Sequence, residues 1–150
     1  MSKVLIASDH AGLPGKETVK KTLDQMGIAY EDLGTHSQDS VDYPDYAEQV
    51  ARRVASGQAE RGVLVCGSGI GMEIAANKIP GIRAALAWNE ETAKLSREHN
   101  DANIVAIGSR TTPQETIEQI TRAFMTTAFA AGRHTQRIEK IKNLEQQHKD

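Results

Sequence analysis

Short aliphatic runs alternate with amphipathic stretches along this chain. The strand-like runs cover residues 4–7, 28–33, 62–66, 82–87 and 104–107. Helical spacing of apolar residues is found between them, at 16–26, 46–55 and 90–98. Such alternation is typical of parallel strands joined by right-handed crossovers, with helices on both faces of the sheet. We therefore predict an α/β fold, a three-layer α/β/α sandwich around a parallel sheet.

Two helix starts can be placed from local signals. Thr112 can cap a helix whose first position is the following proline, and Glu115 can complete a capping box. This helix is expected to run to about Ala131 and to stop at Gly132. Asn89, followed by two glutamates, marks a second start, because acidic groups favour the positive end of a helix dipole.

The last segment, residues 133–150, has helix-forming composition but only a thin apolar line of Ile138, Ile141 and Leu144. That line is too narrow for a helix that lies fully on its own core. We therefore expect 133–150 to form a C-terminal helix that packs on a second subunit. No repeat or linker divides the chain, so residues 1–150 are expected to form a single domain.

Composition narrows the functional classes. The 150 residues are 39% apolar and 25% charged, as in an ordinary globular domain. The formal net charge of -2 argues against a nucleic acid or an anionic membrane as partner. A lone cysteine excludes an internal disulfide, no apolar run approaches the ~20 residues that span a bilayer, and the first residues do not resemble a signal peptide. We expect a cytoplasmic protein that binds a small molecule.

The most informative turn follows the third predicted strand, because ligands of open parallel sheets bind beyond the carboxyl ends of the strands. Its sequence is Cys66-Gly67-Ser68-Gly69-Ile70-Gly71. The backbone N–H groups of such a turn can converge on an oxyanion, and the positive end of the following helix favours a Cys66 thiolate. A tight turn without a ligand and a buried, inert cysteine are the alternatives. Neither the dinucleotide fingerprint nor the phosphate loop is completed here.

Polar residues also stand near the ends of other strands. Asp9 and His10 follow the first strand, where they could handle a sugar hydroxyl or a phosphate; helix capping and an exposed histidine are the alternatives. His99 and Asn100 precede the fifth strand, where the histidine could be a general acid or both residues could be turn formers.

Three arginines could bind phosphate, namely Arg110, Arg133 and Arg137. The spacing of the last two places them on one helix face, and ion pairing on the surface is the alternative. The five histidines and the cysteine show no metal-ligand spacing such as His-Glu-x-x-His. We expect no metal site.

Seven short segments, ordered along the chain, carry a resemblance to a known family. They are Ser8-Asp9-His10-Ala11-Gly12, Asp42-Tyr43-Pro44, Cys66-Gly67-Ser68-Gly69-Ile70-Gly71, Ala75-Ala76-Asn77-Lys78, Ser96-Arg97-Glu98-His99-Asn100-Asp101, Gly108-Ser109-Arg110 and Gly132-Arg133-His134. In these segments the chain resembles the type B ribose-5-phosphate isomerases, within the ribose/galactose phosphate isomerase family. The resemblance implies a Rossmann-like fold with a five-stranded parallel sheet. It further implies interconversion of ribose 5-phosphate and ribulose 5-phosphate, as in the pentose phosphate pathway, without metal or organic cofactor.

The resemblance also implies an assembly and residue roles. The assembly would be a homodimer with active sites shared between subunits, or a dimer of such dimers. Cys66 would be the base, and the amides of residues 67–71 would hold the enediolate oxygen. His99 would assist ring opening, while Asp9 and Asn100 would position sugar oxygens. His10 and Arg110 would bind the phosphate. Arg133 and Arg137, from the partner subunit, would bind it as well.

Some alternatives stay open. One branch of the family uses a glutamate in the glycine turn; Met72 stands at that position here, and the presence of Cys66 assigns the chain to the cysteine branch. Glu73 is interpreted as a first-turn helix residue, and whether Glu73 or His134 contributes to the site is left open. The motifs do not separate relatives that isomerise allose 6-phosphate or galactose 6-phosphate. A phosphate- or nucleotide-binding module without activity is the non-enzyme alternative.

Overall fold

Five parallel strands form one sheet at the centre of the computed structural model, which describes residues 3–147. The strands are β1 Val4–Ser8, β2 Tyr30–Asp32, β3 Gly62–Cys66, β4 Ala84–Leu86 and β5 Ile104–Gly108. Their order across the sheet is β2-β1-β3-β5-β4. Every residue of β1, β3 and β5 is buried, as expected of central strands covered on both faces. The predicted five-stranded parallel sheet is confirmed.

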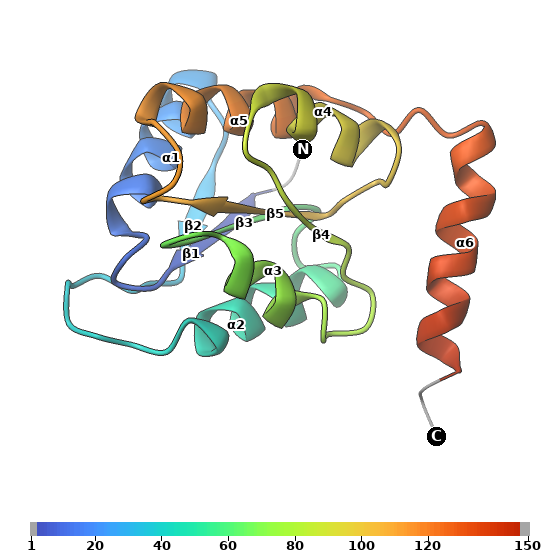
Figure 1. Ribbon diagram of the computed structural model, residues 1–150, viewed down its shortest axis with the longest axis horizontal. Coiled ribbons are helices and arrows are strands. Elements are labelled where there is room, and N and C mark those ends of the chain that lie inside the picture. Colours follow the sequence, from blue (N-terminus) through green and yellow to red (C-terminus); the bar gives the residue numbers. More distant parts are fainter. Residues whose placement is uncertain (1–2, 148–150) are drawn as a thin grey trace.

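Helices cover both faces of this sheet (Figure 1). They are α1 Leu13–Met26, α2 Tyr43–Ala55, α3 Ile70–Ala76, α4 Glu90–Glu98, α5 Gln114–Thr126 and α6 Arg133–Gln146. One core lies between the sheet and α1, α4 and α5, and a second lies between the sheet and α2 and α3. Figure 1 shows α6 standing apart from the three layers. Within residues 3–147, no helix is long and apolar enough to cross a membrane.

The start of α4 agrees with the sequence, and both ends of α5 differ from it. Asn89 caps α4 in a capping box with Thr92. At α5, Thr112 makes no cap, because Pro113 itself occupies the capping position with an extended backbone. This helix ends at Thr126, five residues before the predicted end at Ala131, since the next residue is extended. The predicted threonine cap and helix end were therefore wrong.

The C-terminal helix α6 begins at Arg133, as predicted, and ends at Gln146. Residues 148–150 of the predicted helix 133–150 lie outside the described residues. Only His134 and Ile138 of α6 are buried, whereas Ile141 and Leu144 are exposed. The helix thus carries apolar surface that its own chain leaves uncovered.

Candidate active site

The carboxyl edge of the sheet brings the first, third and fifth strand ends together. Ser8 pairs with Val65 in the sheet register, and Cys66 pairs with Gly108. The segments that follow these strands meet at a cleft of about 670 Å³. Its lining contains most of the predicted site residues: Asp9, His10, Ala11, Tyr43, Cys66, Gly67, Ser68, Ile70, Gly71, Ile74, Arg110 and Thr111. We call this space the Cys66 cleft.

Cys66 is the last residue of β3 and lines the cleft although only 5% of its surface is exposed. The backbone N–H of Gly69 donates a hydrogen bond to its Sγ atom at 3.2 Å. A donor aimed at sulfur stabilises negative charge there. The Cys66 carbonyl accepts from Ser109 N–H at 2.8 Å, which ties the glycine turn to the segment after β5. The sulfur is thus fixed in place beside the space that a substrate would fill.

The glycine turn divides its backbone N–H groups between two uses. Those of Gly69 and Ile70 are bound internally, the first to Cys66 Sγ and the second to Ser68 Oγ at 3.3 Å. Those of Gly67, Ser68 and Gly71 have no hydrogen-bond partner among residues 3–147. The predicted oxyanion donors are therefore reduced to the second group, because an N–H already bound to the sulfur or to the Ser68 hydroxyl is not free for a substrate oxygen.

Gly69 is the glycine of the turn whose backbone is left-handed, a conformation that other residues rarely adopt without strain. Its φ is +80°, and a Cβ atom there would lie 2.9 Å from the Ile107 carbonyl carbon and 3.0 Å from the Gly108 nitrogen. Both contacts are with backbone, which cannot move aside cheaply. Close packing of the turn against β5 therefore depends on glycine.

Asp9 is buried at the start of the turn between β1 and α1. Its Oδ1 atom accepts a hydrogen bond from Gly12 N–H at 2.9 Å, at the residue that precedes α1. The side chain also lines the Cys66 cleft. One carboxylate oxygen thus binds the N–H of Gly12, which precedes α1, and the side chain also borders the cleft; its contact with a sugar hydroxyl or a phosphate stays a prediction.

His10 and Arg110 stand at the junction of the Cys66 cleft with an adjoining hollow of about 700 Å³. The Nδ1 atom of His10 accepts a hydrogen bond from Val41 N–H at 3.2 Å. In the neutral ring the proton is therefore on Nε2, which leaves that atom as a donor. The Arg110 guanidinium makes no ion pair with any residue in 3–147. An imidazole N–H and a free guanidinium make this junction suitable for a phosphate group.

A buried ion pair supports the segment that holds His10. Lys16 of α1 is 1% exposed, and its Nζ donates to Asp32 Oδ1 at 2.8 Å and to the Thr35 carbonyl at 2.6 Å. Burial alone would raise the pKa of Asp32, but the hydrogen bond from Lys16 holds it below its ordinary value. Lys16 thereby anchors the start of the segment 34–42. Near the end of the same segment, Val41 contacts His10.

Tyr43 is a lining residue to which the sequence assigned no role. It is the first residue of α2, and a Cβ atom on Gly71 would lie 2.5 Å from its ring. The missing side chain of Gly71 thus lets the tyrosine lie against the first turn of α3. The motif that contains Tyr43 was part of the resemblance, but its contact with Gly71 joins distant parts of the chain and leaves no local signal. Ala11, Ile74 and Thr111 complete the unpredicted lining.

The remaining predicted residues lie at the opposite edge of the sheet. His99 follows α4 and precedes the amino end of β5, whereas Cys66 pairs with the carboxyl end of β5. The His99 ring stacks on His134 of α6, with ring centroids 4.3 Å apart. Asn100 is next in the chain, and Arg133 and Arg137 are exposed on α6. Within one chain, none of these residues lines the Cys66 cleft.

Two further residues left open by the sequence also lie away from the Cys66 cleft. The Glu73 carboxylate accepts a hydrogen bond from Leu86 N–H, which commits it to the edge strand β4. Burial, together with the nearby charges of His99, Arg133 and Arg137, holds the pKa of His134 below its ordinary value. Within residues 3–147, no group of three His, Cys, Asp or Glu side chains is arranged to hold a metal ion.

Comparison with known proteins places the chain in a family. A family model described as Ribose/Galactose Isomerase matches residues 4–141. Ribose-5-phosphate isomerase B of Escherichia coli (strain K12) is 42% identical over 146 residues, which cover 97% of this chain and 98% of the relative. The structure of Clostridium thermocellum ribose-5-phosphate isomerase B superimposes with a TM-score of 0.95 and 44% identity, over 97% of this chain and 99% of that one.

A second solved structure was determined with a sugar phosphate. It is ribose-5-phosphate isomerase B of Mycoplasma genitalium with bound ribulose 5-phosphate, which is 38% identical with a TM-score of 0.91. The alignment covers 96% of each chain. Family model, relatives and solved structures agree over nearly the whole sequence, and this chain belongs to the ribose/galactose isomerase family.

Proposed function

We propose that this chain interconverts ribose 5-phosphate and ribulose 5-phosphate, with Cys66 as the base. The observation that carries the proposal is the position of Cys66, which lines a cleft together with Gly67, Ser68 and Gly71, whose backbone N–H groups have no partner within residues 3–147. Relatives named as ribose-5-phosphate isomerases B over nearly the full length support the substrate. Membership of the family favours the enzyme over a module that only binds phosphate or nucleotide.

The reaction is a proton transfer between neighbouring carbons. The Cys66 thiolate removes the proton from C2 of the open-chain aldose, and the electron pair moves to form the enediolate. The free N–H groups of the glycine turn stabilise the negative oxygen; one such donor is worth about 3 kcal/mol in the barrier. The O2 hydroxyl proton then moves to O1, and the thiol returns its proton to C1, which yields the ketose. Asp9 faces the sugar hydroxyls, while His10 and Arg110 hold the phosphate at the junction with the adjoining hollow.

Replacing Cys66 tests the chemistry directly. In Cys66→Ala, kcat for ribose 5-phosphate should fall about 10³-fold, because no other base stands at that position. Substrate affinity should change little, since the thiolate acts in the transition state. Ketose formation and the Kd for ribose 5-phosphate, measured on the same samples, check both halves. Turnover equal to wild type would remove Cys66 from this role.

The carbon count of the substrate needs a separate measurement. Allose 6-phosphate and galactose 6-phosphate differ from ribose 5-phosphate in length, and the Cys66 cleft opens into the adjoining hollow, which leaves room along the chain of the sugar. Comparing kcat/KM for the three aldoses decides between them. A preference for a six-carbon aldose would keep the mechanism and change the substrate.

The separation of the two groups of residues supports a homodimer with shared sites. His99 cannot reach a sugar at Cys66 in its own chain, because the two lie at opposite edges of the sheet. A second copy can bring His99, Asn100, Arg133 and Arg137 to that cleft. There His99 would move the proton that opens the furanose ring, Asn100 would bind a sugar oxygen, and the two arginines would complete the phosphate site.

The surface between α6 and the body is suited to such a second copy. A groove of about 670 Å³ separates α6 from α3, β4 and α4. Its apolar lining includes Trp88, Ile141 and Leu144, of which Trp88 is 62% and Leu144 56% exposed. Exposed apolar side chains of this size mark an interface. Here the occupant is another copy, because the Cys66 cleft needs residues that only another copy can supply.

Mixing two inactive variants tests the shared site. Cys66→Ala and His99→Gln homodimers should each be nearly inactive. Random exchange of subunits would give hybrids with one intact site, and activity should recover to about one quarter of wild type. The rise in activity after mixing, measured alongside the size of the particle, checks the model. No recovery between variants that do exchange subunits would show that each site belongs to one chain.

A further inference from the structure

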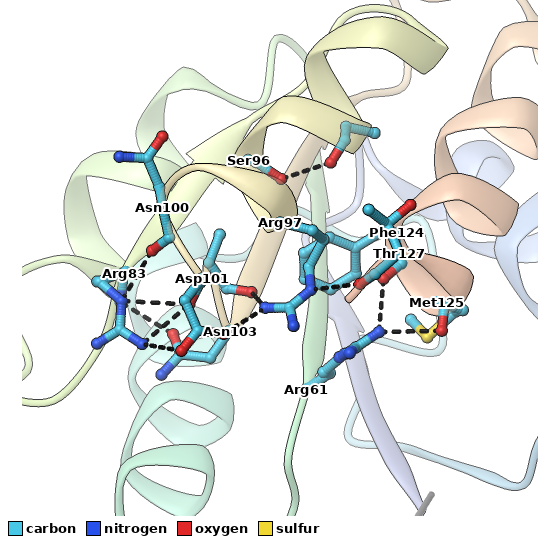
Figure 2. A network of polar contacts seen from close by, with 12 residues as sticks. Arg61, Arg83, Ser96, Arg97, Asn100, Asp101, Asn103, Phe124, Met125 and Thr127 are labelled. Atoms are coloured by element: carbon cyan, nitrogen blue, oxygen red, sulfur yellow. Dashed lines mark hydrogen bonds and ion pairs between the residues drawn. The ribbon is translucent and has the colours of Figure 1, made fainter. Parts of the chain in front are cut away.

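The turn that holds His99 and Asn100 is fixed by an arginine network at the amino edge of the sheet (Figure 2). The turn connects α4 to β5 and reverses at Asp101, whose φ is +47°. Aspartate is one of the few residues other than glycine that adopt this left-handed conformation. A change at Asp101 therefore acts on both the direction of the chain and the charges that hold it.

Arg83 binds the turn from the side of β4. Its Nε atom donates to the Asn100 carbonyl at 3.1 Å and to the Asp101 carbonyl at 3.2 Å. Its Nη2 atom donates to the same Asp101 carbonyl at 2.9 Å and to Asp101 Oδ2 at 3.3 Å. One guanidinium thus holds two successive backbone carbonyls and a carboxylate oxygen.

Arg97 binds the other oxygen of Asp101. Its Nη1 atom donates to Asp101 Oδ1 at 3.0 Å and to the Ala102 carbonyl at 2.6 Å. The Nε atom donates to the Thr127 carbonyl at 3.0 Å, and the guanidinium lies 5.9 Å from the centre of the Phe124 ring. Arg97 is only 6% exposed. The Asp101 carboxylate therefore bridges Arg83, which is partly buried, and Arg97, which is buried (Figure 2).

The His99 side chain is held from the other direction. Its ring stacks on His134 with an angle of 20° between the ring planes. The Glu98 carbonyl, one residue before His99, accepts a hydrogen bond from Ala130 N–H at 3.0 Å, which ties the end of α4 to the segment before α6. Backbone and ring of His99 are thus both fixed without any contact to the Cys66 cleft of the same chain.

We propose that Asp101 is a positioning residue for ring opening: by bridging Arg83 and Arg97 it holds His99 and Asn100 at the geometry in which they meet the sugar in the other subunit. The inference rests on the proposed function, which gives His99 its role. Ring opening needs the imidazole within hydrogen-bond reach of the ring oxygen, and a displacement of about 1 Å costs about 10²-fold in rate. The turn between α4 and β5 is short, and we expect the hydrogen bonds from Arg83 and Arg97 to hold the His99 imidazole within this distance of its productive position.

The test separates ring opening from binding of the open chain. For Asp101→Ala, kcat for ribose 5-phosphate should fall about 30-fold. The Kd of an acyclic four-carbon hydroxamate phosphate, whose nitrogen takes the place of C1 of the enediolate and which needs no ring opening, should change less than about threefold. Asp101→Asn keeps the left-handed backbone and one carboxamide oxygen for an arginine, and should recover kcat to within about fivefold of wild type.

Two further variants keep the result interpretable. Arg83→Met removes the contacts to the turn from a partly exposed position, and should reproduce the fall in kcat even where Asp101→Ala folds poorly. Glu31→Ala removes the ion pairs of this β2 residue with Arg53 of α2 and with Lys3, far from the turn, and should leave both kcat and Kd unchanged. A kcat within about threefold of wild type in Asp101→Ala and Arg83→Met, or a Kd that weakens in parallel with kcat, would overturn the inference. Absence of isomerisation in the wild type would instead refute the proposed function.

Discussion

The two edges of the sheet treat their polar groups in opposite ways. At the carboxyl edge, the glycine turn leaves N–H groups free and Arg110 has no ion pair within residues 3–147. At the amino edge, Arg83 and Arg97 each hold several acceptors, and Arg61 donates to the carbonyls of Phe124 and Met125. Groups left open can bind a ligand, whereas groups fully bound fix the positions of their neighbours.

Helix polarity explains the difference. Helices of a parallel α/β fold start at the carboxyl edge of the sheet and end at the amino edge, and the first N–H groups and last carbonyls of a helix lack partners within it. Free N–H groups attract an oxyanion, and free carbonyls attract cations such as arginine. Arg61 meets this need at the end of α5, where its Nη1 atom lies 2.7 Å from the Phe124 carbonyl. The burial of Arg61, together with the nearby charge of Arg97, lowers its pKa.

Gly69→Ala should disrupt the glycine turn at the carboxyl edge of the sheet, and we expect it to have the largest effect of the changes that follow. The added Cβ would meet the backbone of Ile107 and Gly108, so the turn must shift and lose both the N–H bond to sulfur and its free donors. We expect kcat to fall at least about 10²-fold. Gly57→Ala is the matched control, because φ is +87° there but no atom lies within 4 Å of the added Cβ. It should cost about 1 kcal/mol of unfolding free energy and leave kcat unchanged. Equal kcat losses in the two variants would assign the effect to backbone strain alone.

Arg97→Lys should weaken the amino edge by a smaller amount. Lysine keeps the charge but not the planar fork that serves Asp101, Ala102 and Thr127 together. We expect a loss of about 2 kcal/mol in the free energy of unfolding, measured by urea titration. The control Arg52→Lys changes an exposed ion pair with Glu48. There the loss in the free energy of unfolding should stay below about 0.5 kcal/mol. Equal losses at the two positions would mean that the arginine network adds no stability.

Two kinds of feature could be predicted from the sequence: a helix cap, and the residues that gather at the carboxyl edge of the sheet. The Asn89 cap was confirmed because a cap depends on residues within one turn. Asp9, Cys66 and Arg110 could be placed in one cleft, since the carboxyl ends of parallel strands share an edge. The roles given to these residues by resemblance stay predictions until the variants are measured.

Features set by distant contacts could not be predicted. The end of α5 was wrong because arginines from elsewhere in the chain, such as Arg61, bind its last carbonyls and Thr127 turns away from the helix. Tyr43 was missed because its neighbour Gly71 is far away in sequence. The arginine network around Asp101 was hidden for the same reason, although the motif that contains this residue was noted.

Because α6 stands apart from its own chain, the activity of the proposed dimer would depend on the concentration of the enzyme. This helix buries only His134 and Ile138 against its own chain, and it holds Arg133 and Arg137, two of the residues proposed for the neighbouring site. Dilution below the dissociation constant of the dimer would remove both the partner's arginines from the cleft and the cover from the apolar side of the helix. Specific activity would then fall as the enzyme is diluted, and a saturating sugar phosphate that bridges both subunits would restore it by mass action. The substrate would thus help to assemble the site that consumes it.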